Sequence, residues 1–207
     1  MAKFGVYIIE SLRSEEFADG ENLASILKLA NIEHQYHWAD SVSHFFELIA
    51  DFKISRFKYL HISCHADEEG IQINGNDISN SEFSEALNGT LRNRRLFMSA
   101  CRAANDDLAA RVITVCGAYS LIGTGIDLRF VTSAVFWPAF YHVMKEIDAG
   151  AMSRADLKAK LKQCAVLFGF PIRYYSYLKA DRKGSIRKLE ITGFEDSPRT
   201  TTINIKT

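Results

Sequence analysis

Cysteine is scarce in this chain of 207 residues, and its spacing follows no motif. No two of the four cysteines are spaced as Cys-x-x-Cys, which argues against a zinc knuckle or a thioredoxin-like redox motif. So few cysteines in a chain this long do not suggest a disulfide framework either. We therefore expect free thiols, no bound metal and no cofactor. The cysteines are Cys64, Cys101, Cys116 and Cys164.

The chain also lacks an excess of charge and a long apolar run. Lys plus Arg and Asp plus Glu each number 25, and no basic cluster alternates with aromatic residues, so we expect no nucleic acid partner. No apolar stretch approaches the length that spans a bilayer, so we expect no membrane association. The start, "MAKFGVYIIES", is interrupted by Glu10 and has no cleavage signal. These features predict a cytoplasmic protein.

What the chain does contain is apolar material, at 47% of its residues, in alternating patterns. Short apolar runs typical of strands alternate with segments of helical periodicity, and there is no internal repeat or clear linker. This alternation predicts one domain over residues 1–207: an α/β three-layer sandwich with a mostly parallel sheet and helices on both faces. Expected strands cover 4–10, 34–40, 57–64, 94–101, 118–125, 185–194 and 200–207. Expected helices cover 21–32, 41–52, 81–91, 105–117, 128–147 and 152–168, the last after a break at Gly150.

One segment departs from the simple alternation. In "GIQINGNDIS", Asn74 and Gly75 stand between Ile71 and Ile73 on one side and Ile78 on the other. Asn-Gly flanked by alternating apolar residues is a strong hairpin signal. We expect a β-hairpin directly after the strand that ends near residue 65.

Two residues that could take part in catalysis, a histidine and a cysteine, fall at predicted strand ends. His65 ends "YLHISCH" and Cys101 ends "LFMSAC". In open α/β sheets reactive residues gather at the carboxyl ends of parallel strands, and an ordinary right-handed crossover would make these strands neighbours. A nearby imidazole can take the thiol proton and return it to a leaving group, and the helix starting near Asn105 would favour a thiolate. A lone strand-end cysteine is nevertheless more often core packing, so pattern alone leaves both interpretations open.

The segments "YLHISCHADEEGIQINGNDIS" and "LFMSACRAAN" resemble the CHAT family, caspase-like cysteine peptidases related to caspases, separase and the gingipains. The family pattern is a strand ending in His, a hairpin, a helix, and a second strand ending in Ser-Ala-Cys-Arg. Further similarity runs through "LAARVITVCGAYSLIGTGIDLRFVTSAVFWPAFYHVM". The resemblance covers roughly residues 4–147 and leaves out the C-terminal quarter.

By this resemblance Cys101 is the nucleophile and His65 the general base and later acid. The backbone N–H groups of Cys101 and Ala66 would form the oxyanion hole. Ala66 replaces the usual glycine, and would be strained if that glycine needs a positive φ. Asp127 matches a position that lines the specificity pocket of basic-specific relatives, and a plain helix N-cap is the alternative interpretation.

The resemblance implies a cysteine endopeptidase that binds a protein substrate as an extended strand. Prokaryotic relatives often act as effector proteases in defence systems, so an activating partner protein is a further expectation. The main alternative is a catalytically silent α/β interaction module, which Ala66 and the missing glycine after "SACR" favour. A glutaminase-type acyl transferase ranks last, because Ala100 and Arg102 do not fit a Gly-flanked nucleophile elbow.

Overall fold

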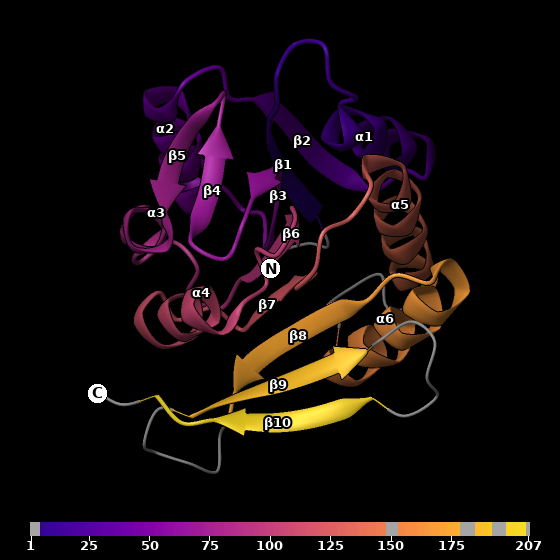
Figure 1. Cartoon of the computed structure of the whole chain (residues 1–207). Helices are drawn as coiled ribbons and strands as arrows, with labels where there is room; N and C mark the ends of the chain where they lie inside the picture. The colour runs from indigo at the N-terminus through magenta and orange to yellow at the C-terminus, as the bar shows by residue number, and fades with distance from the viewer. Residues whose placement is uncertain (1–4, 148–152, 179–184, 192–197, 206–207) are drawn as a thin grey trace.

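A computed structural model describes residues 5–147, 153–178, 185–191 and 198–205, which form one continuous sheet with helices packed on it (Figure 1). The strand bounds are β1 Gly5–Ser11, β2 Glu33–Trp38, β3 Tyr59–Ala66, β4 Gly70–Ile73, β5 Asn76–Ser79, β6 Arg95–Ser99, β7 Ser120–Gly123, β8 Ile172–Tyr177, β9 Ile186–Ile191 and β10 Arg199–Ile203. The main sheet has the order β10-β9-β8-β7-β6-β3-β1-β2, and β4 pairs with the end of β3.

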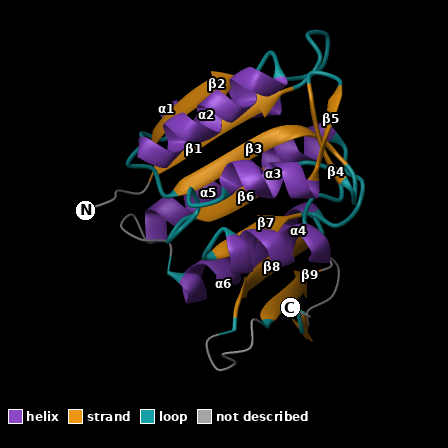
Figure 2. Ribbon diagram, turned by 90° about the vertical axis from the view of Figure 1, so that its left-hand side faces the viewer, coloured by secondary structure: helices purple, strands orange, loops and turns teal. Residues whose placement is uncertain are grey.

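Helices cover both faces of this sheet (Figure 2). One face carries α1 (Asp19–Leu29), α5 (Phe130–Ile147) and α6 (Arg154–Phe168), with α5 packed against both α1 and α6. The other carries α2 (Val42–Ile54), α3 (Asn80–Leu87), α4 (Asp106–Ala110) and a π-helical turn, η1 (Arg111–Val115). Two buried apolar clusters lie between the sheet and these layers. The predicted three-layer α/β sandwich is confirmed.

The sheet is parallel over its first part and antiparallel over its last. Strands β2, β1, β3, β6 and β7 run parallel, whereas β8, β9 and β10 each run antiparallel to their neighbour. Strand β8 is absent from the sequence-based prediction. Its signals were nonetheless present: Gly169 ends α6 in the left-handed conformation, Pro171 follows, and the next run is rich in Ile and Tyr. The predicted break at Gly150 lies outside the described residues.

The predicted hairpin is confirmed as β4 and β5. Asn74 and Gly75 both have positive φ, 46° and 80°, as a two-residue type I′ turn requires. The Asn74 N–H donates to Oγ of Ser11 at 3.0 Å, and its side chain donates to the Asp40 carbonyl at 2.7 Å. Because Ser11 ends β1, these bonds place the hairpin in line with β1, on one side of β3.

The predicted helices differ from the structure in detail, and the one expected over 81–91 ends at Leu87. Residues 105–117 form a short α-helix followed by the π-helical turn rather than one regular helix. The predicted helix 128–147 begins at Phe130 instead of Leu128. The Leu128 backbone is held by Cys101 at this point, which brings the segment before α5 to the end of β6.

Candidate active site at the ends of β3 and β6

The sheet register brings together the ends of the two strands near which His65 and Cys101 stand. Strands β3 and β6 are parallel neighbours, and their last paired residues are Ser63 and Ser99. His65 and Cys101 each follow two positions later. His65 still lies in β3 and shares the face of Ser63, whereas Cys101 stands in the turn directly after β6. The expectation that the two strands are neighbours is confirmed.

Cys101 differs from the other three cysteines in its environment. Cys64, Cys116 and Cys164 are 1%, 2% and 5% exposed, as expected for core residues, whereas Cys101 is partly exposed. Burial raises the pKa of Cys116 to about 11 and also raises the pKa of Cys64 and Cys164. A thiol reagent or a substrate carbonyl therefore has one accessible sulfur to react with, and it lies at this strand end.

The segment that leads into α5 and the first residue of α5 contact the two candidate residues. The Leu128 N–H donates to Sγ of Cys101 at 3.3 Å, and the thiol faces the Leu128 carbonyl at 3.6 Å. Two residues later the Phe130 ring meets the His65 ring edge-on, with centroids 5.4 Å apart. The Leu128 backbone thus contacts the sulfur through both its N–H and its carbonyl, and the Phe130 ring limits the orientations of the imidazole.

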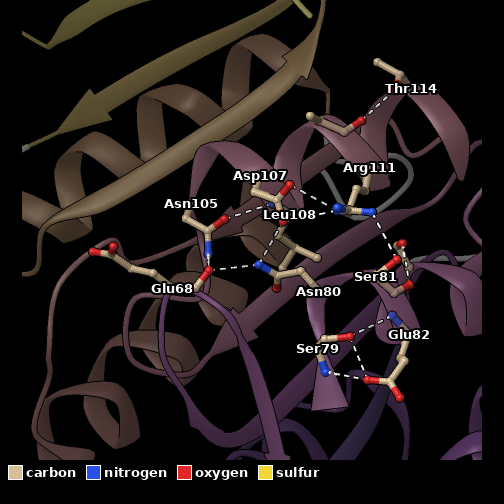
Figure 3. Close-up of polar contacts among 12 residues, drawn as sticks. Glu68, Ser79, Asn80, Ser81, Glu82, Asn105, Asp107, Leu108, Arg111 and Thr114 are labelled. Carbon is tan, nitrogen blue, oxygen red and sulfur yellow. Dashed lines mark hydrogen bonds and ion pairs between the residues drawn. The ribbon is translucent and has the colours of Figure 1, made fainter. Parts of the chain in front are cut away.

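A second tie joins the loop after His65 to the turn after Cys101 (Figure 3). The side-chain amide of Asn105 donates to the Glu68 carbonyl at 3.1 Å, and that of Asn80 donates to the same oxygen at 2.9 Å. Asn105 is also the N-cap of α4, accepting the Leu108 N–H at 2.9 Å. The same side chain thus caps the helix and joins the two loops of the candidate site.

His65 has an acidic partner that the sequence analysis did not identify. Its Nε2 lies 2.8 and 3.0 Å from the two carboxylate oxygens of Glu16, in the loop between β1 and α1. Partial desolvation tends to raise the pKa of Glu16, but the hydrogen bonds from the Arg13 N–H and the His65 ring outweigh this effect, so the pKa of Glu16 is lowered. No motif marks Glu16, because it stands 49 positions before His65 in an irregular loop. Only the folded chain brings the two together.

The backbone at Ala66 suits an oxyanion-hole donor. Ala66 pairs with Ile71 in β4, and the Asp67 N–H donates to the Gly70 carbonyl at 3.0 Å. Hydrogen-bonded and non-hydrogen-bonded pairs alternate in an antiparallel ladder, so the Ala66 N–H points away from β4. Because the hairpin lies in line with β1, the opposite edge of β3 faces the end of β6. This is the side on which Cys101 lies.

The strain expected at Ala66 is absent. Among described residues other than glycine, positive φ occurs at Asn31, Asn74, Asn93 and Arg102, and not at Ala66. The left-handed residue of this site is Arg102, directly after the cysteine, with φ of 51°. Within the described part of the chain the Cys101 N–H has no acceptor, so it is free to bind a substrate oxygen.

Asp127 is engaged by Arg102. The guanidinium donates to both carboxylate oxygens, at 2.9 and 2.8 Å, and both side chains are exposed. Asp127 stands three residues before the first residue of α5 and does not cap it, so the N-cap interpretation is wrong. Its role towards a basic substrate side chain stays a prediction, and such a side chain would have to share the carboxylate with Arg102.

A pocket of about 420 Å³ adjoins the imidazole between the end of β3 and the hairpin. His65 and Ala66 line it together with four acidic residues, which are Asp67, Glu69, Asp77 and Glu82.

No set of three or more metal-ligating side chains gathers anywhere in the described residues, and none of their helices is long and apolar enough to cross a membrane. The chain matches no protein-family model and no curated protein.

Proposed function

We propose that this protein is a caspase-like cysteine endopeptidase of the CHAT type, with Cys101 as nucleophile and His65 as general base. The observation that supports this most directly is the register of β3 and β6, which brings an imidazole and the accessible thiol to adjacent strand ends. The order of hairpin, helix and strand between them agrees with the family pattern described above.

The chemistry follows from these positions. Nδ1 of His65 takes the proton of the Cys101 thiol, while Nε2 donates to Glu16. The thiolate attacks the peptide carbonyl, and the N–H groups of Cys101 and Ala66 bind the oxyanion that forms. His65 then gives the proton to the leaving amine, which produces a thioester. Water, deprotonated by His65, hydrolyses the thioester and restores the free thiol.

The substrate is a protein segment bound in extended form, and Asp127 contributes to recognition of a basic side chain. The protein works in the cytoplasm as an effector protease, and a partner protein activates it, as in prokaryotic defence systems. These parts rest on the family resemblance. The acidic lining of the pocket beside His65 agrees with a basic substrate residue.

The test uses both thiol labelling and proteolysis. Iodoacetamide and a peptidyl electrophile should modify Cys101 of the folded wild-type protein, as read by peptide mass spectrometry. His65→Gln should slow the modification near pH 7, and Cys101→Ala should abolish cleavage of candidate substrate proteins. Cys164→Ala is the matched control, because it removes a buried thiol and should leave both readouts unchanged.

A catalytically silent interaction module is the second candidate. It is favoured by the Leu128 backbone, whose N–H and carbonyl both contact the Cys101 sulfur, and by alanine in place of glycine after His65. If Cys101 reacts with the peptidyl electrophile no faster than a free cysteine does, and His65→Gln changes nothing, the peptidase proposal fails and the silent module replaces it.

A further inference from the structure

A buried polar row lies one step below the candidate dyad. Glu10, Ser63 and Ser99 are register neighbours on β1, β3 and β6, and they are 0%, 0% and 4% exposed. Because alternate residues of a strand share a face, this row lies on the same face of the sheet as His65, and its member on β6, Ser99, comes two residues before Cys101. Three polar side chains therefore replace the apolar residues that a sheet normally buries at such positions.

Asp19 joins two members of this row. It is the first residue of α1, is 3% exposed, and accepts the hydroxyl of Ser99 at 2.6 Å and the hydroxyl of Ser63 on its other oxygen. Ser63 precedes His65 by two residues, and Ser99 precedes Cys101 by two. One carboxylate thus bridges the two strands at the last residues before each candidate catalytic group.

Glu10, the member of this row on β1, holds the start of α1 in place. The N-cap residue Ala18 makes no side-chain cap, and the Glu10 carboxylate accepts the N–H of Gly20 at 2.7 Å and of Glu21 at 2.9 Å instead. A Cβ at position 20 would lie 3.0 Å from that carboxylate, so glycine permits the close approach. The start of α1, which carries Asp19, is therefore also anchored from β1, through a carboxylate that the Ser63 hydroxyl contacts as well at 3.2 Å.

This arrangement is costly for the fold. Neither carboxyl takes part in any ion pair between described residues. The two carboxyls face each other, and the other groups that face them are the Ser63 and Ser99 hydroxyls, the Tyr36 hydroxyl at 2.9 Å from Glu10, and the α1 N–H groups. Burial raises the pKa of Glu10 to about 7 and raises the pKa of Asp19, so one of the pair retains a proton more readily than a surface acid.

We propose that Asp19 is a positioning residue for the dyad, which sets the spacing of the β3 and β6 ends from which His65 and Cys101 project. The inference rests on the proposed function and adds a residue to it. The same helix start is reached through the loop that carries Glu16, so Asp19 also fixes the distance over which Glu16 reaches the imidazole. A buried bridge at this place thus supports three side chains of the site.

The test measures the rate at which iodoacetamide alkylates Cys101 between pH 5.5 and 9, together with thermal unfolding. Asp19→Asn keeps the shape of the side chain but replaces one of its two acceptor oxygens by an NH2 group. Ser99→Ala removes the hydroxyl that donates to Asp19 from β6. Ser120→Ala is the matched control: it removes a buried strand hydroxyl that bonds Arg95 at 2.9 Å, at the opposite end of β6. His65→Gln reports on the dyad itself.

Asp19→Asn and Ser99→Ala should slow alkylation near pH 7 by roughly 10-fold, since small displacements of reacting groups cost large factors in rate. Their profiles should approach that of an unassisted thiol, while Ser120→Ala keeps the wild-type profile. The proposal is overturned if Asp19→Asn and Ser99→Ala alkylate like the wild type while His65→Gln slows the reaction. If Asp19→Asn does not fold, Ser99→Ala decides. If His65→Gln leaves the wild-type rate unchanged, the peptidase proposal fails and the positioning role with it.

Discussion

Nε2 of His65 lies 2.8 Å from Oε1 of Glu16, which leaves Nδ1 as the ring atom available to Cys101. With Nε2 protonated and donating to the carboxylate, Nδ1 carries the lone pair that a general base needs. In the mechanism proposed above, the carboxylate would also stabilise the imidazolium that forms when the thiol loses its proton. The proposed dyad would then have an acid–imidazole–thiol order, in which Glu16 comes from the loop between β1 and α1.

Replacing Glu16 tests this order directly. Glu16→Gln should lower the rate of Cys101 alkylation near pH 7 by roughly 10-fold, because a neutral amide does not stabilise the imidazolium. The effect should shrink above pH 9, where the thiol ionises without help. Glu15→Gln is the control, since the neighbouring carboxylate bonds Ser14 and not the imidazole. Equal rates for the two variants would contradict the role of Glu16.

The tie through Asn105 can be separated from its helix cap. Asn105→Asp keeps the oxygen that accepts the Leu108 N–H but removes the amide that donates to the Glu68 carbonyl. We expect slower Cys101 alkylation, by several-fold, because the loop after His65 is no longer joined to the turn after Cys101. The cap remains, but the new carboxylate oxygen faces the Glu68 and Arg102 carbonyls, so a modest loss of thermal stability should accompany the slower reaction.

Ser79→Ala provides the comparison for that variant. Ser79 caps α3 by accepting the Glu82 N–H, and its loss should cost about 1 kcal/mol of stability. It makes no contact with the Glu68 carbonyl, so the alkylation rate should stay at the wild-type value. A slower rate in Ser79→Ala than in Asn105→Asp would mean that general loosening, and not the tie, governs the thiol.

Asp127 is tested by separating recognition from stability. Its ion pair with Arg102 joins two exposed side chains, so Asp127→Asn should change the free energy of unfolding by less than about 1 kcal/mol. If Asp127 recognises a basic substrate residue, cleavage next to Lys or Arg should fall while alkylation of Cys101 is unchanged. Asp107→Asn, which breaks the exposed ion pair with Arg111, should change neither the cleavage next to Lys or Arg nor the alkylation of Cys101. Unchanged cleavage in Asp127→Asn would remove it from the substrate site.

Much of this architecture could be predicted because it depends on local patterns. The alternation of apolar runs with helical periodicity predicted the sandwich, and Asn74-Gly75 predicted the hairpin. His65 and Cys101 were found because both follow apolar strands directly, and strand ends are where open sheets carry chemistry. Strand order then followed from the short crossover between them.

The remaining features depend on contacts between distant segments. Glu16 lies in an irregular loop, and neither its spacing nor its neighbours distinguish it from Glu15. Asp19 has the signature of an exposed acid at a helix start, which is its ordinary role, and only the structure shows it buried against Ser63 and Ser99. Similarly, Ala66 has no positive φ, whereas Arg102 has one in the turn after the cysteine, and the residue type at position 102 does not reveal it.

His61 lies two residues before Ser63 on the same face of β3. Its burial predicts that the fold loses stability as the pH falls. The ring is 1% exposed, its Nδ1 contacts the Tyr141 hydroxyl at 3.1 Å, and burial lowers its pKa from 6.5 to about 3. Between these two values the unfolded chain binds a proton that the folded chain does not, so its contribution to stability is lost as the pH falls below 6.5.

The variant His61→Gln removes this proton-binding group. Relative to the wild type, its free energy of unfolding should rise by about 2 kcal/mol between pH 6.5 and pH 5, because each pH unit corresponds to about 1.4 kcal/mol. Urea unfolding at both pH values measures this difference, in which the titration of Glu10 cancels. His142→Gln, at an exposed position of α5, should follow the wild type. Parallel pH dependences for His61→Gln and the wild type would show that His61 titrates alike in the folded and unfolded chain, against the desolvation that its burial imposes.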